Sequence, residues 1–141
     1  MKPIVIDSSF FLRSLVIFNV DYALYFEQIK EWEKSKIKLY APTLWHYEVT
    51  STITKNLRFK TITVEQADHA FVLLSKFKVQ LVRPNPKLTA TAYAWTRKLQ
   101  RASAYDSFYL ALAQALDTDF WTADKKLYNA VGTDWIHMLE S

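Results

Sequence analysis

The sequence predicts a three-layer α/β/α domain with a central, mostly parallel sheet of four to five strands. Short apolar runs alternate with amphipathic helical stretches along all 141 residues. Each apolar run stops at a proline or a polar turn, which is typical of buried parallel strands. Strands that are separated by helices pair in parallel through right-handed crossovers, and this places helices on both faces of the sheet.

Length and composition predict one domain spanning residues 1–141. Half of the residues are hydrophobic and 16% are aromatic, so the composition is not that of a disordered chain. The mean hydropathy is -0.08, and no apolar run reaches the roughly 18 residues of a membrane-spanning helix. Asp7 interrupts the apolar N-terminal run and no small-residue cleavage site follows. We therefore expect a cytoplasmic protein without a signal peptide.

The first half of the chain is predicted to hold two strands and three helices. The first strand covers residues 2–7, and a helix over 8–18 follows with Ser8 or Ser9 as its N-cap. Residues 20–36 repeat apolar side chains at helical spacing. A second strand over 37–42 ends at a proline, and Thr43 caps a third helix through about Phe59.

The second half repeats this alternation. Thr63 and Gln66 fit a capping box that opens a helix through about Phe77. A third strand over 78–84 precedes a helix over 88–101, and Ser103 opens the next helix through Leu116. The fourth strand covers 118–123, a short helix covers 124–130, and residues 134–139 fit a fifth strand.

Four acidic residues lie where a strand or helix meets a turn: Asp7, Glu48, Asp106 and Asp124. In sheets of this kind ligands bind beyond the carboxyl ends of the strands. Asp7 and Asp124 directly follow strands, and Glu48 lies in the helix after the second strand, whereas the place of Asp106 depends on where its helix starts. Carboxylates without cysteine suit a hard cation such as Mg²⁺ or Mn²⁺. The pattern indicates metal-assisted phosphodiester cleavage.

Each of these acids also has a purely structural interpretation. Asp7 or Asp124 can cap the helix that follows it, and Asp106 fits the third position of a capping box with Ser103. Glu48 gains from a nearby helix N-terminus. Three other aspartates are excluded, because they lie in solvated turns or at the opposite end of a strand: Asp117, Asp119 and Asp134.

Hydroxyl and basic side chains extend the candidate site. Ser9 and Thr122 each lie beside a site acid, where a hydroxyl orients a carboxylate or holds a metal-bound water, although helix capping explains both equally well. The net charge is +4, and it becomes +8 if four acids are committed to metal, which favours polyanions. The basic residues form two clusters: Lys55, Arg58 and Lys60, then Arg97 and Arg101, which share a helix face. Solvated surface is the default interpretation of both clusters, and contact with RNA phosphates is the alternative.

Other site chemistries are not supported by the residue types. The chain has no cysteine, and its three histidines are far apart, so neither residue type is expected to hold a metal. A single glycine cannot build the glycine-rich turn of a dinucleotide site. Aromatic residues exceed what one sheet face needs in the first half of the chain, which indicates an exposed apolar groove for a partner segment or a homodimer face.

Three segments carry a family resemblance. VIDSS around Asp7, the YDSFYLALAQAL helix with Asp106 and the WTADKKL turn with Asp124 resemble the PIN-domain family, with a looser match around Glu48. Size and layout resemble the VapC-type toxins of toxin–antitoxin pairs. One departure is the Ala-Leu-Asp117-Thr118 segment, where the family often has a glycine turn.

The resemblance implies a specific activity. Asp7, Glu48, Asp106 and Asp124 correspond to the family's acidic Mg²⁺ or Mn²⁺ set, and Ser9 and Thr122 match positions where the family often has hydroxyls. The implied protein is a metal-dependent endoribonuclease that hydrolyses RNA phosphodiester bonds, forms a homodimer and pairs with a VapB-type antitoxin. The alternative is a PIN-like RNA- or partner-binding module with little or no nuclease activity. The RNA, the antitoxin and the number of metal ions stay open.

Overall fold

A five-stranded parallel sheet forms the centre of the molecule, in the order β3-β2-β1-β4-β5. The computed structural model describes residues 2–18, 21–101 and 103–139. All four strand pairs are parallel, which confirms the predicted sheet, including its fifth strand. The strands are β1 (Ile4–Ile6), β2 (Leu39–Pro42), β3 (Gln80–Val82), β4 (Phe120–Trp121) and β5 (Ile136–His137).

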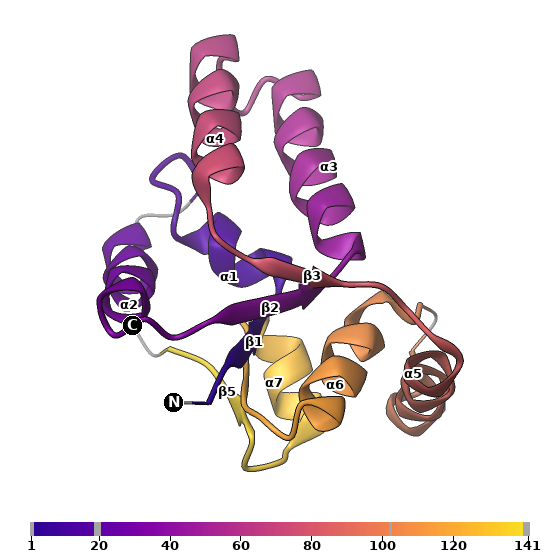
Figure 1. Ribbon diagram of the computed structural model, residues 1–141. Helices are drawn as coiled ribbons and strands as arrows, with labels where there is room; N and C mark the ends of the chain where they lie inside the picture. Colours follow the sequence, from indigo (N-terminus) through magenta and orange to yellow (C-terminus); the bar gives the residue numbers. More distant parts are fainter. Residues whose placement is uncertain (1, 19–20, 102, 140–141) are drawn as a thin grey trace.

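Helices cover both faces of this sheet, so the predicted three-layer α/β/α architecture is confirmed. Figure 1 shows α1 to α4 on one side of the strands and α5 to α7 on the other. The ends of α3 and α4 point away from the sheet side by side. The helices are α1 (Ser8–Arg13), α2 (Tyr22–Lys34), α3 (Leu44–Arg58), α4 (Val64–Lys76), α5 (Pro86–Leu99), α6 (Tyr105–Ala115) and α7 (Lys125–Val131). No helix within the described ranges is long and apolar enough to cross a membrane.

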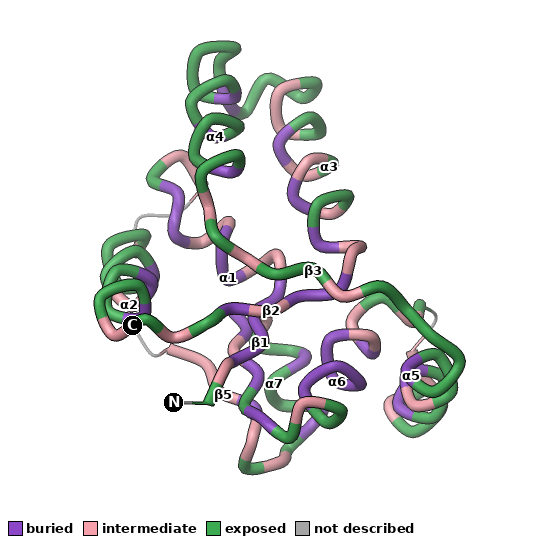
Figure 2. The backbone as a smooth tube through the Cα atoms, viewed as in Figure 1, coloured by how far each residue is buried: buried purple, intermediate pink, exposed green. Residues whose placement is uncertain are grey.

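Alternating residues of β1 join the two sides of the core. Ile4 and Ile6 pack in a cluster with α2, including its fully buried Tyr25, whereas Val5 joins the larger cluster that contains Leu110 of α6. The buried path through the sheet and the exposed outer faces of the helices are visible in Figure 2. Because β1 is covered on both sides, the turn that follows it is held firmly, and this turn carries the first candidate acid.

Several helix ends differ from the prediction. Helix α1 ends at Arg13 rather than at residue 18, and its N-cap is Asp7, not Ser8 or Ser9. The capping box of Thr63 and Gln66 is confirmed. Helix α6 begins after Ala104 without a side-chain cap, so the predicted capping box between Ser103 and Asp106 is wrong.

The end of α5 corrects one prediction that bears on function. The helix stops at Leu99 because Gln100 adopts a left-handed conformation with φ 54°. The N–H of Arg101 then bonds back to the carbonyl of Thr96, 3.2 Å away, as in a Schellman turn. Arg101 therefore lies beyond the helix, and the predicted helix face shared by Arg97 and Arg101 does not exist.

Left-handed turns occur here at residues other than glycine. Lys36, Lys60 and Asp117 have φ values of 59°, 59° and 50°, and each directly follows a helix end. Asp117 thus occupies the left-handed turn for which the PIN resemblance led us to expect glycine. A left-handed backbone costs a residue with a Cβ roughly 1 kcal/mol, and aspartate tolerates it better than lysine does.

Candidate active site

The four candidate acids come from four separate segments at one edge of the sheet. Asp7 follows β1 directly, and Asp124 lies three residues after the end of β4. Glu48 is the fifth residue of α3, which starts just after β2, and Asp106 is the second residue of α6. Parallel strands end at a common edge, and this edge is where such sheets bind ligands.

Asp7 is the most constrained of the four. Its side chain is only 4% exposed. One carboxylate oxygen accepts from the Ser9 hydroxyl at 2.6 Å and from the Phe10 N–H at 3.0 Å, and the other accepts from the Thr122 hydroxyl. Burial raises the pKa of Asp7 to about 7 against these hydrogen bonds, and the nearby charge of Asp106 adds to the rise. Asp7 caps α1 and also faces the other acids, so its structural and functional interpretations are compatible.

Two hydroxyls tie the turn after β1 to the turn after β4. The Ser9 oxygen accepts from the Ala123 N–H at 3.0 Å and lies 3.4 Å from the Thr122 hydroxyl oxygen. The Thr122 oxygen accepts from the Asp124 N–H at 3.0 Å. Both hydroxyls therefore orient Asp7, and they fix the backbone at Ala123 (Ser9) and at Asp124 (Thr122), which goes beyond helix capping.

Glu48 is held by two residues that the sequence did not single out as site residues. Its Oε1 accepts from the Tyr109 hydroxyl at 2.6 Å and from the Ser8 hydroxyl at 3.3 Å. Burial raises the pKa of Glu48, Tyr109 opposes the rise and the Asp106 charge adds to it. Tyr109 is 1% exposed and stacks on Phe120 of β4, with ring centroids 5.9 Å apart.

The role of Tyr109 has a recognisable sequence signal. It lies three residues after Asp106, which places both on one face of α6. A buried tyrosine hydroxyl needs a hydrogen-bond partner. Burial and the neighbouring Glu48 both raise the pKa of Tyr109, so its hydroxyl stays protonated and donates to the carboxylate.

Asp106 forms an ion pair with Arg101 at 3.1 Å, between side chains that are 33% and 26% exposed. Burial raises the pKa of Asp106, the Arg101 charge lowers it, and the Asp124 charge raises it further. The guanidinium of Arg101 is thus engaged with a site acid. The sequence analysis had grouped this arginine with Arg97, as solvated surface by default and as an RNA phosphate contact in the alternative.

Asp124 caps the last helix. Its Oδ1 accepts from the Leu127 N–H at 3.2 Å, which satisfies one of the free N–H groups at the start of α7. The predicted capping interpretation is therefore confirmed. Because Asp124 also raises the pKa of Asp106, its carboxylate stands within electrostatic reach of the other acids.

Among the described residues, no three acids or histidines already form a metal-ligand group. The donor set nevertheless fits a hard divalent cation. Three oxygens accept no hydrogen bond within the described chain: Glu48 Oε2, Asp106 Oδ1 and Asp124 Oδ2. Carboxylate oxygens are the ligands that Mg²⁺ and Mn²⁺ prefer. A cation there would relieve the mutual repulsion of the acids.

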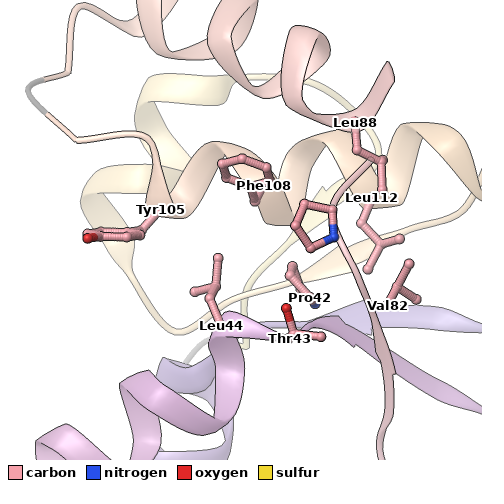
Figure 3. Close-up of a pocket in the computed structure, with 9 residues that line it drawn as sticks. Pro42, Thr43, Leu44, Val82, Leu88, Tyr105, Phe108 and Leu112 are labelled. Carbon is pink, nitrogen blue, oxygen red and sulfur yellow. The ribbon is translucent and has the colours of Figure 1, made fainter. Parts of the chain in front are cut away.

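An apolar pocket of about 170 Å³ lies between the helices that carry Glu48 and Asp106. Figure 3 shows it between the start of α3 and the first turns of α6, with Tyr105 and Phe108 on one side and Leu44 on the other. None of the four candidate acids lines this pocket.

The other predicted contacts lie farther away. Lys55 and Arg58 are in the last turn of α3 with Lys60 just beyond, at the end that points away from the sheet. Arg97 stacks over the Tyr93 ring at 5.9 Å on α5. Among the predicted aromatic surplus, Phe10, Phe11, Tyr25, Trp32 and Trp45 are core, whereas Tyr22, Phe26 and Tyr47 are exposed.

This fold and site define an α/β/α domain of the class that gathers acidic side chains at the carboxyl edge of a parallel sheet. The family model described as PIN domain matches residues 4–132. The chain therefore belongs to the PIN-domain family. No curated protein matches it.

Solved structures share the fold at low sequence identity. PAE2754 from Pyrobaculum aerophilum is 23% identical, with a TM-score of 0.67 over 97% of this chain and 90% of that one. VapBC2 from Rickettsia felis, bound to a DNA fragment from its promoter, is 11% identical, with a TM-score of 0.70 over 97% and 98%. VapC20 from Mycobacterium tuberculosis, a sarcin-ricin loop cleaving toxin, is 18% identical, with a TM-score of 0.62 over 92% and 95%.

Proposed function

We propose that this protein is a metal-dependent endoribonuclease that hydrolyses RNA phosphodiester bonds. The observation that carries the proposal is the gathering of Asp7, Glu48, Asp106 and Asp124 at one sheet edge, where the charge of Asp106 adds to the raised pKa of Asp7 and of Glu48, and the charge of Asp124 adds to that of Asp106. Buried carboxylates that repel one another cost stability unless a cation is bound. Membership of the PIN-domain family supports a nuclease.

Each group of site residues would have a separate role in this reaction. The four acids would hold one or two Mg²⁺ or Mn²⁺ ions, which polarise the scissile phosphate and lower the pKa of a bound water. Ser9 and Thr122 fix the orientation of Asp7. Asp106 and Asp124 each keep one oxygen without a hydrogen bond in the described chain, and one of these two acids would help to accept the proton of the attacking water while the others hold the cation.

We further propose that the protein is the toxin of a VapBC-type pair, forms a homodimer and acts in the cytoplasm. The fold similarity to a VapBC complex and to a VapC toxin supports this assignment. An apolar groove of about 220 Å³ between the end of α1, α2 and α4 is lined by Tyr22, Phe26 and Leu73, which are all exposed. This groove would take a segment of the VapB-type antitoxin.

Two observations favour a second candidate function. Arg101 occupies Asp106, and the described residues hold no preformed metal-ligand group. A PIN-like module that binds RNA or a partner with little or no cleavage accommodates both facts. The two candidates differ in whether a divalent cation displaces Arg101 from Asp106.

Cleavage of a mixed RNA substrate separates these candidates. We expect cleavage with Mg²⁺ or Mn²⁺, none with EDTA and none with Asp106→Asn. The control is Asp134→Asn, which removes one exposed carboxylate outside the site and should cleave as the wild type does. Mn²⁺ titration calorimetry on the same proteins supplies a readout without RNA. A wild-type protein that neither cleaves nor binds Mn²⁺ would support the binding module.

A further inference from the structure

A groove lined by lysines lies at the amino ends of β2 and β3, opposite to the acidic edge. Its volume is about 760 Å³, and five lysines from two distant segments line it together with one acid, Glu33. The lysines are Lys30, Lys36, Lys38, Lys76 and Lys78. Figure 1 shows how the connection from α2 to β2 and the connection from α4 to β3 bring these segments to the same part of the molecule.

Most of this charge is uncompensated. Lys30 pairs with Glu33 at 3.4 Å. The other four lysines are exposed, and no ion pair joins them to an acid within the described residues. Uncompensated ammonium groups around one groove create a local positive potential that attracts a polyanion.

Two of these lysines come just before paired strand residues. Tyr40 pairs with Gln80 in the parallel ladder, and Lys38 and Lys78 each lie two residues before these positions. Both lysines line the groove. An anion bound in the groove therefore meets ammonium groups from both of the connections that lead into the sheet.

Lys36 lies in a left-handed turn, a backbone conformation that is unfavourable for lysine. Its backbone φ is 59°, and the N–H of the next residue, Ile37, bonds back to the carbonyl of Trp32 at 3.0 Å. Glycine is the usual residue in this turn. A lysine there places an ammonium group at the groove at the expense of backbone stability.

We infer that this groove is a second RNA-binding site, which holds the sugar-phosphate backbone of the substrate away from the acids. The inference rests on the proposed ribonuclease function. Three apolar residues line the groove together with the lysines: Ile37, Leu39 and Val79. Lysines bind phosphates as point charges and carry no base specificity, while apolar side chains suit ribose and base faces.

The position of the groove sets the size of RNA that uses it. The groove and the acids are separated by the length of β2, roughly 13 Å at 3.3 Å per residue, and β3 is the edge strand. An RNA must pass around this edge to touch both. We therefore expect structured RNA to use the groove and short oligonucleotides to reach the acids without it.

The direct test is the salt dependence of binding to fluorescently labelled bulk transfer RNA, measured by anisotropy in EDTA so that no cleavage occurs. The groove variant is Lys38→Gln/Lys78→Gln, and the matched control is Lys87→Gln/Lys98→Gln, which removes two exposed lysines of α5. Two lost phosphate contacts should lower the slope of log K against log salt by about 1.4 and weaken binding roughly tenfold. Equal slopes for the two variants would overturn the inference and assign the groove to another partner.

A second variant guards against a folding defect. Lys36→Gly removes one groove charge and relaxes the left-handed turn, so the fold is retained, and its slope should fall by about 0.7. A wild-type slope for this variant, with a normal thermal transition, contradicts the inference as well.

A short oligonucleotide separates this inference from the proposed function. The groove variant should cleave it as fast as the wild type does, in the presence of Mg²⁺. If the wild-type protein shows no metal-dependent cleavage, the proposed nuclease function is refuted. If the groove variant cleaves the oligonucleotide normally and its transfer RNA binding has the wild-type salt slope, only the proposed RNA-binding role of the groove is refuted.

Discussion

The carboxylates at one edge of the sheet are buried or half-buried and hydrogen-bonded, whereas the lysines at the opposite edge are exposed and, Lys30 aside, have no acidic partner among the described residues. Asp7 accepts three hydrogen bonds at 4% exposure. Lys38 and Lys78 are exposed to solvent and line the same groove. Both regions concentrate charge of one sign, but they do so in media of very different polarity.

Charge is costly at the acidic edge, where the carboxylates are desolvated, and much less so at the exposed lysine groove. Desolvation is the largest cause of the raised pKa at Asp7, Glu48 and Asp106. Lysines in water are screened within a Debye length of about 8 Å at physiological salt. Removing an acid should therefore change stability and chemistry together, whereas removing a lysine should change RNA affinity and leave the fold nearly untouched.

The largest expected effect comes from Asp7→Asn. The folded pKa of Asp7, about 7, lies above its ordinary value of 3.8, so the native state keeps a proton that the unfolded state loses. The metal-free wild type should therefore lose stability as the pH rises from about 4 to about 7, by up to about 4 kcal/mol. Asparagine does not titrate, so the variant should be the more stable protein at pH 8 and should have lost cleavage.

Urea unfolding in EDTA at pH 4.5 and pH 8 measures this contrast. Mg²⁺ should stabilise the wild type at pH 8 but not Asp7→Asn, because a cation that binds the native state shifts the equilibrium toward it. A variant that is less stable than the wild type at pH 8 would show that the hydrogen bonds of Asp7 outweigh its desolvation.

The next effect is that of Tyr109→Phe. It removes one hydroxyl, so Glu48 loses its 2.6 Å hydrogen bond and keeps only the longer one from Ser8. Loss of a group that orients a metal ligand typically lowers metal affinity or activity 10–100-fold. We expect a drop in this range in Mn²⁺ calorimetry and in oligonucleotide cleavage.

Tyr105→Phe is the matched control for this change. Tyr105 lies on the same helix, is 65% exposed and lines the apolar pocket. Equal Mn²⁺ affinities for the two variants would mean that Glu48 needs no support from Tyr109.

The smallest effect concerns the backbone beneath the lysines. Lys36→Gly and Lys60→Gly each replace a left-handed lysine with φ 59° at a helix end, one in the groove and one beyond α3. Each should gain about 0.5–1 kcal/mol in urea unfolding, because glycine adopts this conformation without steric cost. A loss of stability in either variant would show that the lysine side chain itself stabilises the helix end.

The predicted elements show what pattern reasoning captures well. All five strands and their parallel pairing follow from apolar runs separated by helical stretches. The ends of the elements were less predictable. Arg101 was predicted to be the last residue of the helix over 88–101, but the left-handed Gln100 ends α5 first, and Arg101 pairs with Asp106 instead. A backbone conformation at one residue decided that contact.

The candidate site was also only partly predictable from the sequence. The edge position of Asp7, Glu48 and Asp124 followed from sheet topology. Asp106 needed the start of α6, which the predicted cap at Ser103 misplaced. Tyr109 was missed because a tyrosine within an apolar helix looks like core, and only its packing shows that the hydroxyl meets Glu48.

The sequence alone was enough to predict the layers, the parallel sheet and the residue types of the acidic edge, because hydrophobic periodicity and the alternation of strands with helices are local properties of the chain. Only the three-dimensional fold shows which side chains that are far apart in the sequence come into contact. Ser9 reaches Thr122, Glu48 reaches Tyr109, and lysines near residues 36 and 78 line one groove. Such meetings depend on strand register and on where helices end, and both are set by packing of the whole core.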